Sequence, residues 1–189
     1  MAARRKESAL MHGYLITSPL GDIALRADGN ALTGLFFVGQ KFFPALALGR
    51  LDHGAPSVVV QARKQLAAYF DGTLQAFDLP LRLSGTAFQL RVWRELSAIP
   101  YGAVTSYGAI AARMGLGPEH ARAVGGAIGR NPVSIVVPCH RVLAGGGGLA
   151  GYAAGLGRKQ ALLALEHGTR APELARPAPP QTPYASTPQ

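Results

Sequence analysis

The chain has 189 residues, of which 48% are hydrophobic, so it can build an ordinary globular core as one domain or two small ones. Its formal net charge of +9 predicts a polyanionic partner, with nucleic acid ahead of an anionic membrane surface. No stretch approaches the roughly 20 apolar residues of a membrane span, and no apolar signal core follows the N-terminus. We therefore expect a cytoplasmic protein that does not bind membranes.

The N-terminal region alternates between extended chain and turns. Residues 1–9 are predicted to form a flexible basic N-terminus, and 10–83 an α+β domain. A meander of two or three strands is predicted from segments rich in β-branched and aromatic residues, at 13–18, 22–27 and 31–38. Apolar spacing predicts a helix over 58–70, and extended chain returns at 79–83.

Residues 84–168 have the pattern of a second, mainly helical domain. Thr86 is a candidate cap for a helix over 88–98. Two short helices are then predicted at 106–113 and about 119–129, across a glycine-containing turn, and they outline a helix-turn-helix. This pattern alone is a weak signal for DNA binding, because many helical hairpins bind no DNA.

The end of the second domain is predicted to contain a strand, a turn and a helix. The apolar run 133–137 indicates a buried strand that leads into Pro138-Cys139-His140-Arg141. Residues 145–148 are predicted to form a flexible hairpin tip, and 156–167 a last helix. The tail 169–189 contains six prolines and is predicted to be disordered.

The helix predicted over 119–129 is unusually poor in large side chains. Each interior glycine costs roughly 0.5–1 kcal/mol relative to alanine, so some requirement must offset the cost. One candidate is close packing of another helix. The other is entry into the DNA minor groove, which is about 6 Å wide and admits only a nearly bare helix. The small residues are Ala121, Ala123, Gly125, Gly126, Ala127 and Gly129.

Two arginines flank the bare part of this helix. Arg122, Gly126 and Arg130 are spaced at i, i+4 and i+8, so they share one helix face. Both arginines could be solvated surface charges. Alternatively they hold phosphates, and Arg122 enters the base stack in place of an extruded nucleotide.

Cys139 is the only cysteine, which excludes an internal disulfide framework, and an unpaired thiol fits a reducing compartment. A lone cysteine is ordinarily a small buried hydrophobe, so its neighbours decide its role. Adjacent residues on extended chain point to opposite faces, so we expect a water rather than a direct contact to relay a proton to His140. Glu166 could orient that imidazole, and Asn131 could hold the turn or the thiol. Taken singly, Glu166 also fits a surface charge and Asn131 a helix-terminating residue.

Five motifs across residues 86–168 resemble, in order and spacing, those of the O6-alkylguanine-DNA alkyltransferases. The early Ser18-Pro19-Leu20-Gly21 and Gly39-Gln40-Lys41 are similar to the N-terminal domain of the bacterial members. The resemblance therefore covers nearly all of the chain except its tails. The five motifs are Arg122-Ala123-Val124-Gly125-Gly126-Ala127, Asn131-Pro132, Pro138-Cys139-His140-Arg141-Val142, Gly151-Tyr152-Ala153, and Lys159 with Leu162-Leu163 and Glu166.

The resemblance implies direct-reversal DNA repair by a single-turnover, methylated-DNA–protein-cysteine S-methyltransferase. Cys139 would accept the alkyl group irreversibly from O6-alkylguanine, activated through water by His140. Glu166 would orient that histidine, and Asn131 would support the active-site turn. Tyr107 would contact N3 of the guanine and help to flip the nucleotide. Activity on O4-alkylthymine is left open.

The resemblance also implies a substrate pocket and a DNA-binding face. In the pocket, the backbone oxygens of Cys139 and Val142 would accept from the guanine amine, and the Ala153 amide would donate to O6. Tyr152 and Lys159 would complete the pocket. Arg122 would be the finger that fills the gap left by the flipped base. The rest of the DNA-binding face would be Ala121, Ala123, Gly125, Gly126 and Arg130.

The implied partner is double-stranded DNA that contains O6-alkylguanine, bound by a monomer without a cofactor. Zinc-binding relatives use cysteines that this chain lacks, so we also predict no metal. The chain departs from the family pattern at Ala154, where a glycine is usual, and at Gln160-Ala161, where the family has Glu-Trp. The first change could narrow the mouth of the pocket.

Two other classes of function are open to the same residues. A DNA-binding module without chemistry would need the helix-turn-helix but not Cys139. A cysteine hydrolase would use Cys139 and His140, form an acyl-enzyme and turn over. The hydrolase alternative leaves the bare helix unexplained.

Overall fold

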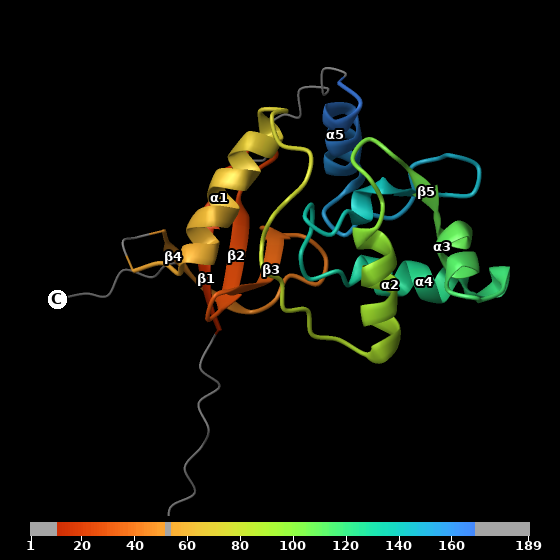
Figure 1. Cartoon of the computed structure of the whole chain (residues 1–189), viewed down its shortest axis with the longest axis horizontal. Coiled ribbons are helices and arrows are strands. Elements are labelled where there is room, and N and C mark those ends of the chain that lie inside the picture. Colours follow the sequence, from red (N-terminus) through yellow and green to blue (C-terminus); the bar gives the residue numbers. More distant parts are fainter. Residues whose placement is uncertain (1–10, 52–53, 169–189) are drawn as a thin grey trace, which may run out of the picture.

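The computed structural model describes residues 11–51 and 54–168, so both predicted tails lie outside the described residues. The N-terminal part is a four-stranded sheet in the order β3-β2-β1-β4 (Figure 1). The predicted meander of two or three strands is confirmed and has three, since β2 pairs antiparallel with both β1 and β3. Strand β4, which pairs parallel to β1, was not predicted. The strands are β1 (Met11–Ile16), β2 (Ile23–Asp28), β3 (Ala31–Phe37) and β4 (Leu46–Arg50).

The predicted helix over 58–70 is present as α1 (Ser57–Phe70). It lies against the sheet in Figure 1, and its buried residues are Val58, Val59, Ala62, Leu66 and Tyr69. The extended chain expected at 79–83 crosses to β3, where Leu32 donates to the Pro80 oxygen at 2.8 Å. The N-terminal part is thus a sheet covered by one helix, and the C-terminal part packs against it.

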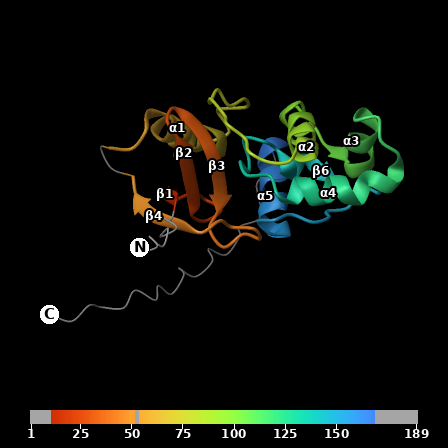
Figure 2. The same cartoon turned by 90° about the horizontal axis from the view of Figure 1, so that it is seen from below.

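The C-terminal part is mainly helical, as predicted, and the α+β fold class is confirmed (Figure 2). Its elements are α2 (Ala87–Ser97), β5 (Thr105–Ser106), α3 (Tyr107–Arg113), the 3₁₀ helix η1 (Pro118–His120), α4 (Ala121–Gly129), β6 (Val142–Leu143) and α5 (Leu156–Glu166). Thr86 caps α2 in a capping box with Gln89. The helix predicted from about 119 begins as η1 and becomes α-helical at Ala121. None of the helices in 11–51 and 54–168 is long and apolar enough to cross a membrane.

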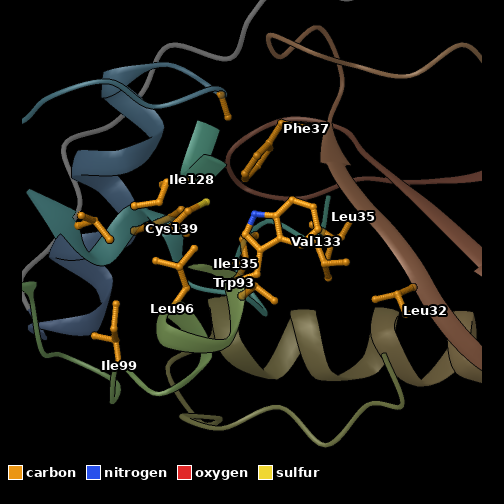
Figure 3. Packing of buried hydrophobic residues seen from close by; sticks show 14 of the residues in the cluster. Leu32, Leu35, Phe37, Trp93, Leu96, Ile99, Ile128, Val133, Ile135 and Cys139 are labelled. Carbon is orange, nitrogen blue, oxygen red and sulfur yellow. The ribbon is translucent and has the colours of Figure 1, made fainter. Parts of the chain in front are cut away.

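One hydrophobic cluster joins the two parts, and Trp93 lies near its middle (Figure 3). Trp93 is 2% exposed, and its indole N–H donates to the Ala127 oxygen of α4 at 3.0 Å. Leu35 of β3 donates from its amide to the Pro132 oxygen at 2.9 Å and forms a bridge with Val133. The sheet is therefore attached directly to the segment that leads to Cys139.

The prediction of a buried strand over 133–137 is correct about burial but wrong about the strand. Val133, Ile135 and Val137 are at most 1% exposed, but the chain turns instead of extending. Ile135 has φ of 70°, far from the φ of about −120 to −140° that is typical of strands. The Asn131 amide donates to the Val137 oxygen at 2.8 Å and lies 3.4 Å from the Val133 oxygen. A side chain thus holds carbonyls that a strand would need for its ladder.

Two further local predictions are corrected beside this turn. Cys139–Arg141 is a 3₁₀ helix, η2, so Cys139 and His140 do not lie on extended chain. Residues 145–148 form a turn closed by a hydrogen bond from the Ala144 amide to the Gly148 oxygen at 3.0 Å. No strand follows that turn before residue 168, so it is not a hairpin tip.

Candidate active site and DNA-binding face

Cys139 lies at the start of η2, and it is 5% exposed. The Asn131 side-chain amide donates to its sulfur at 3.1 Å. Burial raises the pKa of the Cys139 thiol, and the hydrogen bond from Asn131 acts in the opposite direction. Asn131 is therefore placed to favour the thiolate while it also holds the preceding turn.

His140 and Glu166 form a buried pair whose side chains are both 0% exposed. His140 Nε2 lies 2.7 Å from Glu166 Oε1. An ionised carboxylate can only accept, so Nε2 carries the proton and Nδ1 has a free lone pair. Nδ1 is buried and has no hydrogen-bond partner among the described residues. Burial lowers the pKa of His140, so the imidazole is neutral at pH 7 and can accept a proton.

Glu166 gathers more donors than any sequence pattern indicated. Arg141 donates from Nε to Oε2 at 2.8 Å and from Nη2 to Oε1 at 2.9 Å, and Tyr69 donates to Oε1 at 2.7 Å. Burial alone would raise the pKa of Glu166, but hydrogen bonds from His140 and Arg141 outweigh it and lower the pKa to about 2. Glu166 is therefore a buried anion rather than a surface charge.

Arg141 and Tyr69 were not among the predicted site residues. Arg141 stands in the Pro138-Cys139-His140-Arg141-Val142 motif, so the motif could have indicated it. Tyr69 comes from α1, 97 residues before Glu166, and its only sequence signal is the apolar spacing of the helix. Through Tyr69, the N-terminal part takes part in the site.

Lys159 holds two points of the loop 142–155, which carries the predicted substrate contacts. It is 0% exposed, and its ammonium donates to the Val142 oxygen and, at 2.7 Å, to the Ala150 oxygen. Burial lowers the pKa of Lys159. The Val142 oxygen keeps a second lone pair, so the contact with Lys159 leaves it able to accept from a ligand.

Tyr107 contacts the same loop, on which Tyr152 and Ala153 lie. The Tyr107 hydroxyl donates to the loop at the Ala150 oxygen, at a distance of 3.0 Å. The Tyr152 hydroxyl is buried and has no partner among the described residues. The Ala153 oxygen accepts from the Lys41 amide at 2.9 Å, which fixes the peptide next to the predicted O6 donor. The neighbouring Ala154 is buried in the hydrophobic cluster.

Helix α4 has one packed side and one bare side. Its buried residues are Val124, Ala127 and Ile128, whereas Arg122 and Ala123 are exposed. Arg122 has no hydrogen-bond or ion-pair partner in the described part of the chain. Arg130, the second predicted arginine of this face, follows the helix end and donates to the Gly126 oxygen at 3.1 Å.

The glycines of α4 are not required by packing within the chain. A methyl group added at Gly125 would lie 3.6 Å from the Tyr107 ring, and one at Gly126 would lie 3.8 Å from the Arg130 guanidinium. These are ordinary van der Waals distances. Close packing of another helix therefore does not explain the bare side of α4.

The structure thus brings Cys139, Asn131, His140 and Glu166 into one buried group. The substrate-loop residues gather beside Tyr107, which also lies against Gly125 of α4. The remaining predicted DNA contacts stay outside, along the exposed side of that helix. The molecule therefore combines a buried free thiol with a helix whose exposed side carries Arg122.

Known proteins are similar in sequence or structure to most of the chain. The methylated-DNA–protein-cysteine methyltransferase of Mycobacterium tuberculosis H37Rv is 48% identical over 163 residues, which are 86% of this chain and 96% of the relative. That of Methanosarcina acetivorans is 42% identical over 156 residues, 82% of this chain and 98% of the relative. A crystal structure of M. tuberculosis OGT in complex with DNA matches with a TM-score of 0.76 at 44% identity, covering 85% of this chain and 96% of that chain.

Two family models match consecutive parts of the chain. The model of the 6-O-methylguanine DNA methyltransferase ribonuclease-like domain matches residues 11–83. The model of the DNA binding domain of the same methyltransferase matches residues 87–168. The matches include both the sheet and the helices that hold the site. The chain therefore belongs to the 6-O-methylguanine DNA methyltransferase family.

Proposed function

We propose that this protein repairs O6-methylguanine in double-stranded DNA by moving the methyl group irreversibly onto Cys139. The observation that carries the proposal is the buried group around that thiol. Asn131 donates to the sulfur, and His140 presents a free Nδ1 lone pair while Glu166 holds its other nitrogen. Together these residues favour a thiolate and give its proton an acceptor.

In the reaction, the thiol proton passes through a water to His140 Nδ1. The sulfur then attacks the methyl carbon, the new S–C bond forms, and the C–O6 bond breaks with its electron pair moving onto guanine. The guanine anion takes up a proton and becomes the normal base. The product on Cys139 is a thioether, which has no carbonyl that water could attack. Each molecule of protein therefore works once.

The loop beside Cys139 supplies the contacts that recognise the base. The Val142 oxygen accepts from the guanine amine, the Ala153 amide donates to O6, and Tyr152 lines the space for the alkyl group. Lys159 holds this loop at two carbonyls. The Tyr107 hydroxyl must leave the Ala150 oxygen before it can donate to guanine N3.

The exposed side of α4 enters the minor groove of the damaged duplex. The glycines support this step. A Cβ would fit at each of these positions in the free protein, so we attribute the lack of side chains there to close approach by an external surface. Arg122 is exposed and unpartnered in the described part of the chain, so its guanidinium is available to replace a flipped nucleotide in the base stack. Ala121, Ala123, Gly125 and Gly126 allow the close approach.

We further propose that residues 10–83 and 84–168 are the two domains, and that the protein acts as a monomer. A thiol nucleophile needs a reducing compartment, so we place its action in the cytoplasm. No cofactor is needed, because the alkyl group moves directly from substrate to protein.

The test uses a duplex that bears one O6-methylguanine. After incubation, the peptide that contains Cys139 should gain the mass of one methyl group, and Cys139→Ser should gain none. A duplex with O4-methylthymine, which has the same kind of alkyl–oxygen bond, extends the assay to a second lesion. A DNA-binding module without chemistry predicts no mass change, and a hydrolase predicts an adduct that water removes.

A further inference from the structure

Phe42 is an exposed aromatic side chain on the loop after β3, and it is in an uncommon backbone conformation. The residue is 47% exposed, and its φ of 62° lies in the left-handed region that side chains other than glycine rarely adopt. Neither burial nor backbone preference explains a phenylalanine at this position. A strained residue that displays an apolar ring to solvent indicates a function outside the folded chain.

Two cations from different parts of the molecule contact this ring. The Lys41 ammonium lies 5.0 Å from the ring centroid and the Arg130 guanidinium 4.8 Å from it. We call Lys41, Phe42 and Arg130 the Phe42 cluster. Cation–π attraction holds both charges at the ring, so the cluster presents two positive groups around one aromatic side chain. Both basic residues are exposed and can reach a further partner.

The loop that carries Lys41 and Phe42 is held by several hydrogen bonds. Gln40 is 7% exposed, and its side-chain oxygen accepts from the Phe37 amide at 2.9 Å. The Phe43 amide donates to the Gln40 oxygen at 3.2 Å, and the Lys41 amide donates to the Ala153 oxygen at 2.9 Å. The cluster is thus fixed relative to the loop that we assign to guanine.

The Phe42 cluster also continues the surface of α4. Arg130 follows the C-terminal end of that helix, and a methyl group added at Gly129 would lie 3.9 Å from the Phe42 ring. Figures 1 and 2 show the orange loop after β3 running toward the C-terminal part of the molecule, which contains α4. A duplex that receives the bare side of α4 would have its sugar-phosphate backbone near the helix end.

We propose that the Phe42 cluster binds the DNA backbone beyond the C-terminal end of α4. Lys41 and Arg130 contact phosphates, and Phe42 holds the two cations in place. The N-terminal part thereby contributes directly to DNA binding. This inference rests on the proposed function, and it assigns a second contact region to the same duplex.

The experiment measures the affinity of the full chain for a short unmodified duplex at several salt concentrations. Loss of one phosphate contact reduces the slope of log K against log salt by about 0.9, so Lys41→Gln should show a slope shallower by about that amount. Phe42→Ala removes no charge, yet it should weaken binding severalfold because both cations lose their support. Lys64→Gln, which removes an exposed lysine on α1, is the matched control and should leave the slope within error of the parent.

A second substrate separates the outcomes. Each variant is also tested for methyl or benzyl transfer from a free O6-alkylguanine base, which needs no duplex. Weaker duplex binding, with a smaller decrease in the rate of transfer from the free base, supports the proposal. Parent-like duplex binding by both variants overturns it, and so does an equal loss of duplex affinity and of transfer from the free base. If the parent protein takes no methyl from damaged DNA, the proposed function fails instead.

Discussion

The buried group around Cys139 and the exposed side of α4 differ in packing and in how their polar groups are paired. Around Cys139, polar side chains are packed out of water and nearly all are paired, with Glu166 accepting from His140, Arg141 and Tyr69. On α4, three glycines leave room for a Cβ, and Arg122 has no partner in the described chain. The polar groups of the first region find most of their partners within the protein, whereas the exposed side of α4 has room and charge for a partner outside it. Variants of the buried group should therefore lose transfer from both damaged DNA and a free base, whereas variants of α4 should lose it mainly on DNA.

The largest effect is expected in the buried group. His140→Ala removes the proton acceptor, so transfer should slow by roughly a hundred- to ten-thousandfold on both damaged DNA and a free O6-alkylguanine base. Duplex affinity should stay near that of the parent protein. Single-turnover rates and a binding titration measure the two quantities, and a loss confined to DNA would contradict the assignment.

Arg122→Ala, in contrast, should impair the reaction with DNA selectively. Without the guanidinium that fills the gap in the base stack, repair of damaged duplex should slow by roughly tenfold or more, equivalent to about 1.4 kcal/mol or above. Reaction with the free base should change much less, because no nucleotide has to be flipped. Comparison of the two single-turnover rates tests this, and equal losses would remove the finger role.

Gly126→Leu adds bulk to the bare side of α4. Leucine is a better helix former than glycine by up to about 1 kcal/mol, and the nearest group to the new Cβ is the Arg130 side chain at 3.8 Å. The free energy of unfolding should therefore stay the same or rise, while duplex affinity falls. Denaturant unfolding and a binding titration provide the test. A variant that binds duplex as well as the parent would show that α4 does not enter a groove.

Tyr69→Phe should have the smallest effect, and that effect should depend on pH. It removes one donor to Glu166, which costs about 1 kcal/mol of stability at neutral pH. Because the folded pKa of Glu166 is lowered to about 2 from 4.5, its stabilising contribution is present above pH 4.5 and is lost as pH falls toward 2. The difference in stability between parent and variant should shrink over that window. A constant difference across the whole range from neutral to acidic pH would mean that Tyr69 acts only through packing.

Elements with a clear periodic pattern could be predicted from the sequence, and those shaped by distant contacts could not. The helices α1 and α2 carry apolar stripes, and Thr86 is a residue type that commonly caps a helix. Strand β4 is short and largely exposed, so it lacks the alternation that identifies a strand. The run 133–137 has the composition of a buried strand, but the Asn131 side chain holds its carbonyls in a turn.

The site shows the same division between local and distant information. The resemblance of the motifs led to the pair of His140 with Glu166 and to Asn131 beside the thiol, and those contacts are present. The contacts of Tyr69 and Lys41 were not predicted, because each reaches the C-terminal part across about half of the chain. Nothing in the local sequence around a tyrosine on an amphipathic helix or a lysine on a loop indicates which distant group it will meet.

The central claim is that a methyl group moves onto the Cys139 sulfur and stays there. The most direct measurement adds lesion-bearing duplex in excess over protein and counts both repaired lesions and methylated Cys139. We predict that repair stops when one lesion has been removed per protein molecule, with every acceptor thiol converted to a thioether. Continued repair beyond that ratio, or restored duplex alongside unmodified Cys139, would contradict the account.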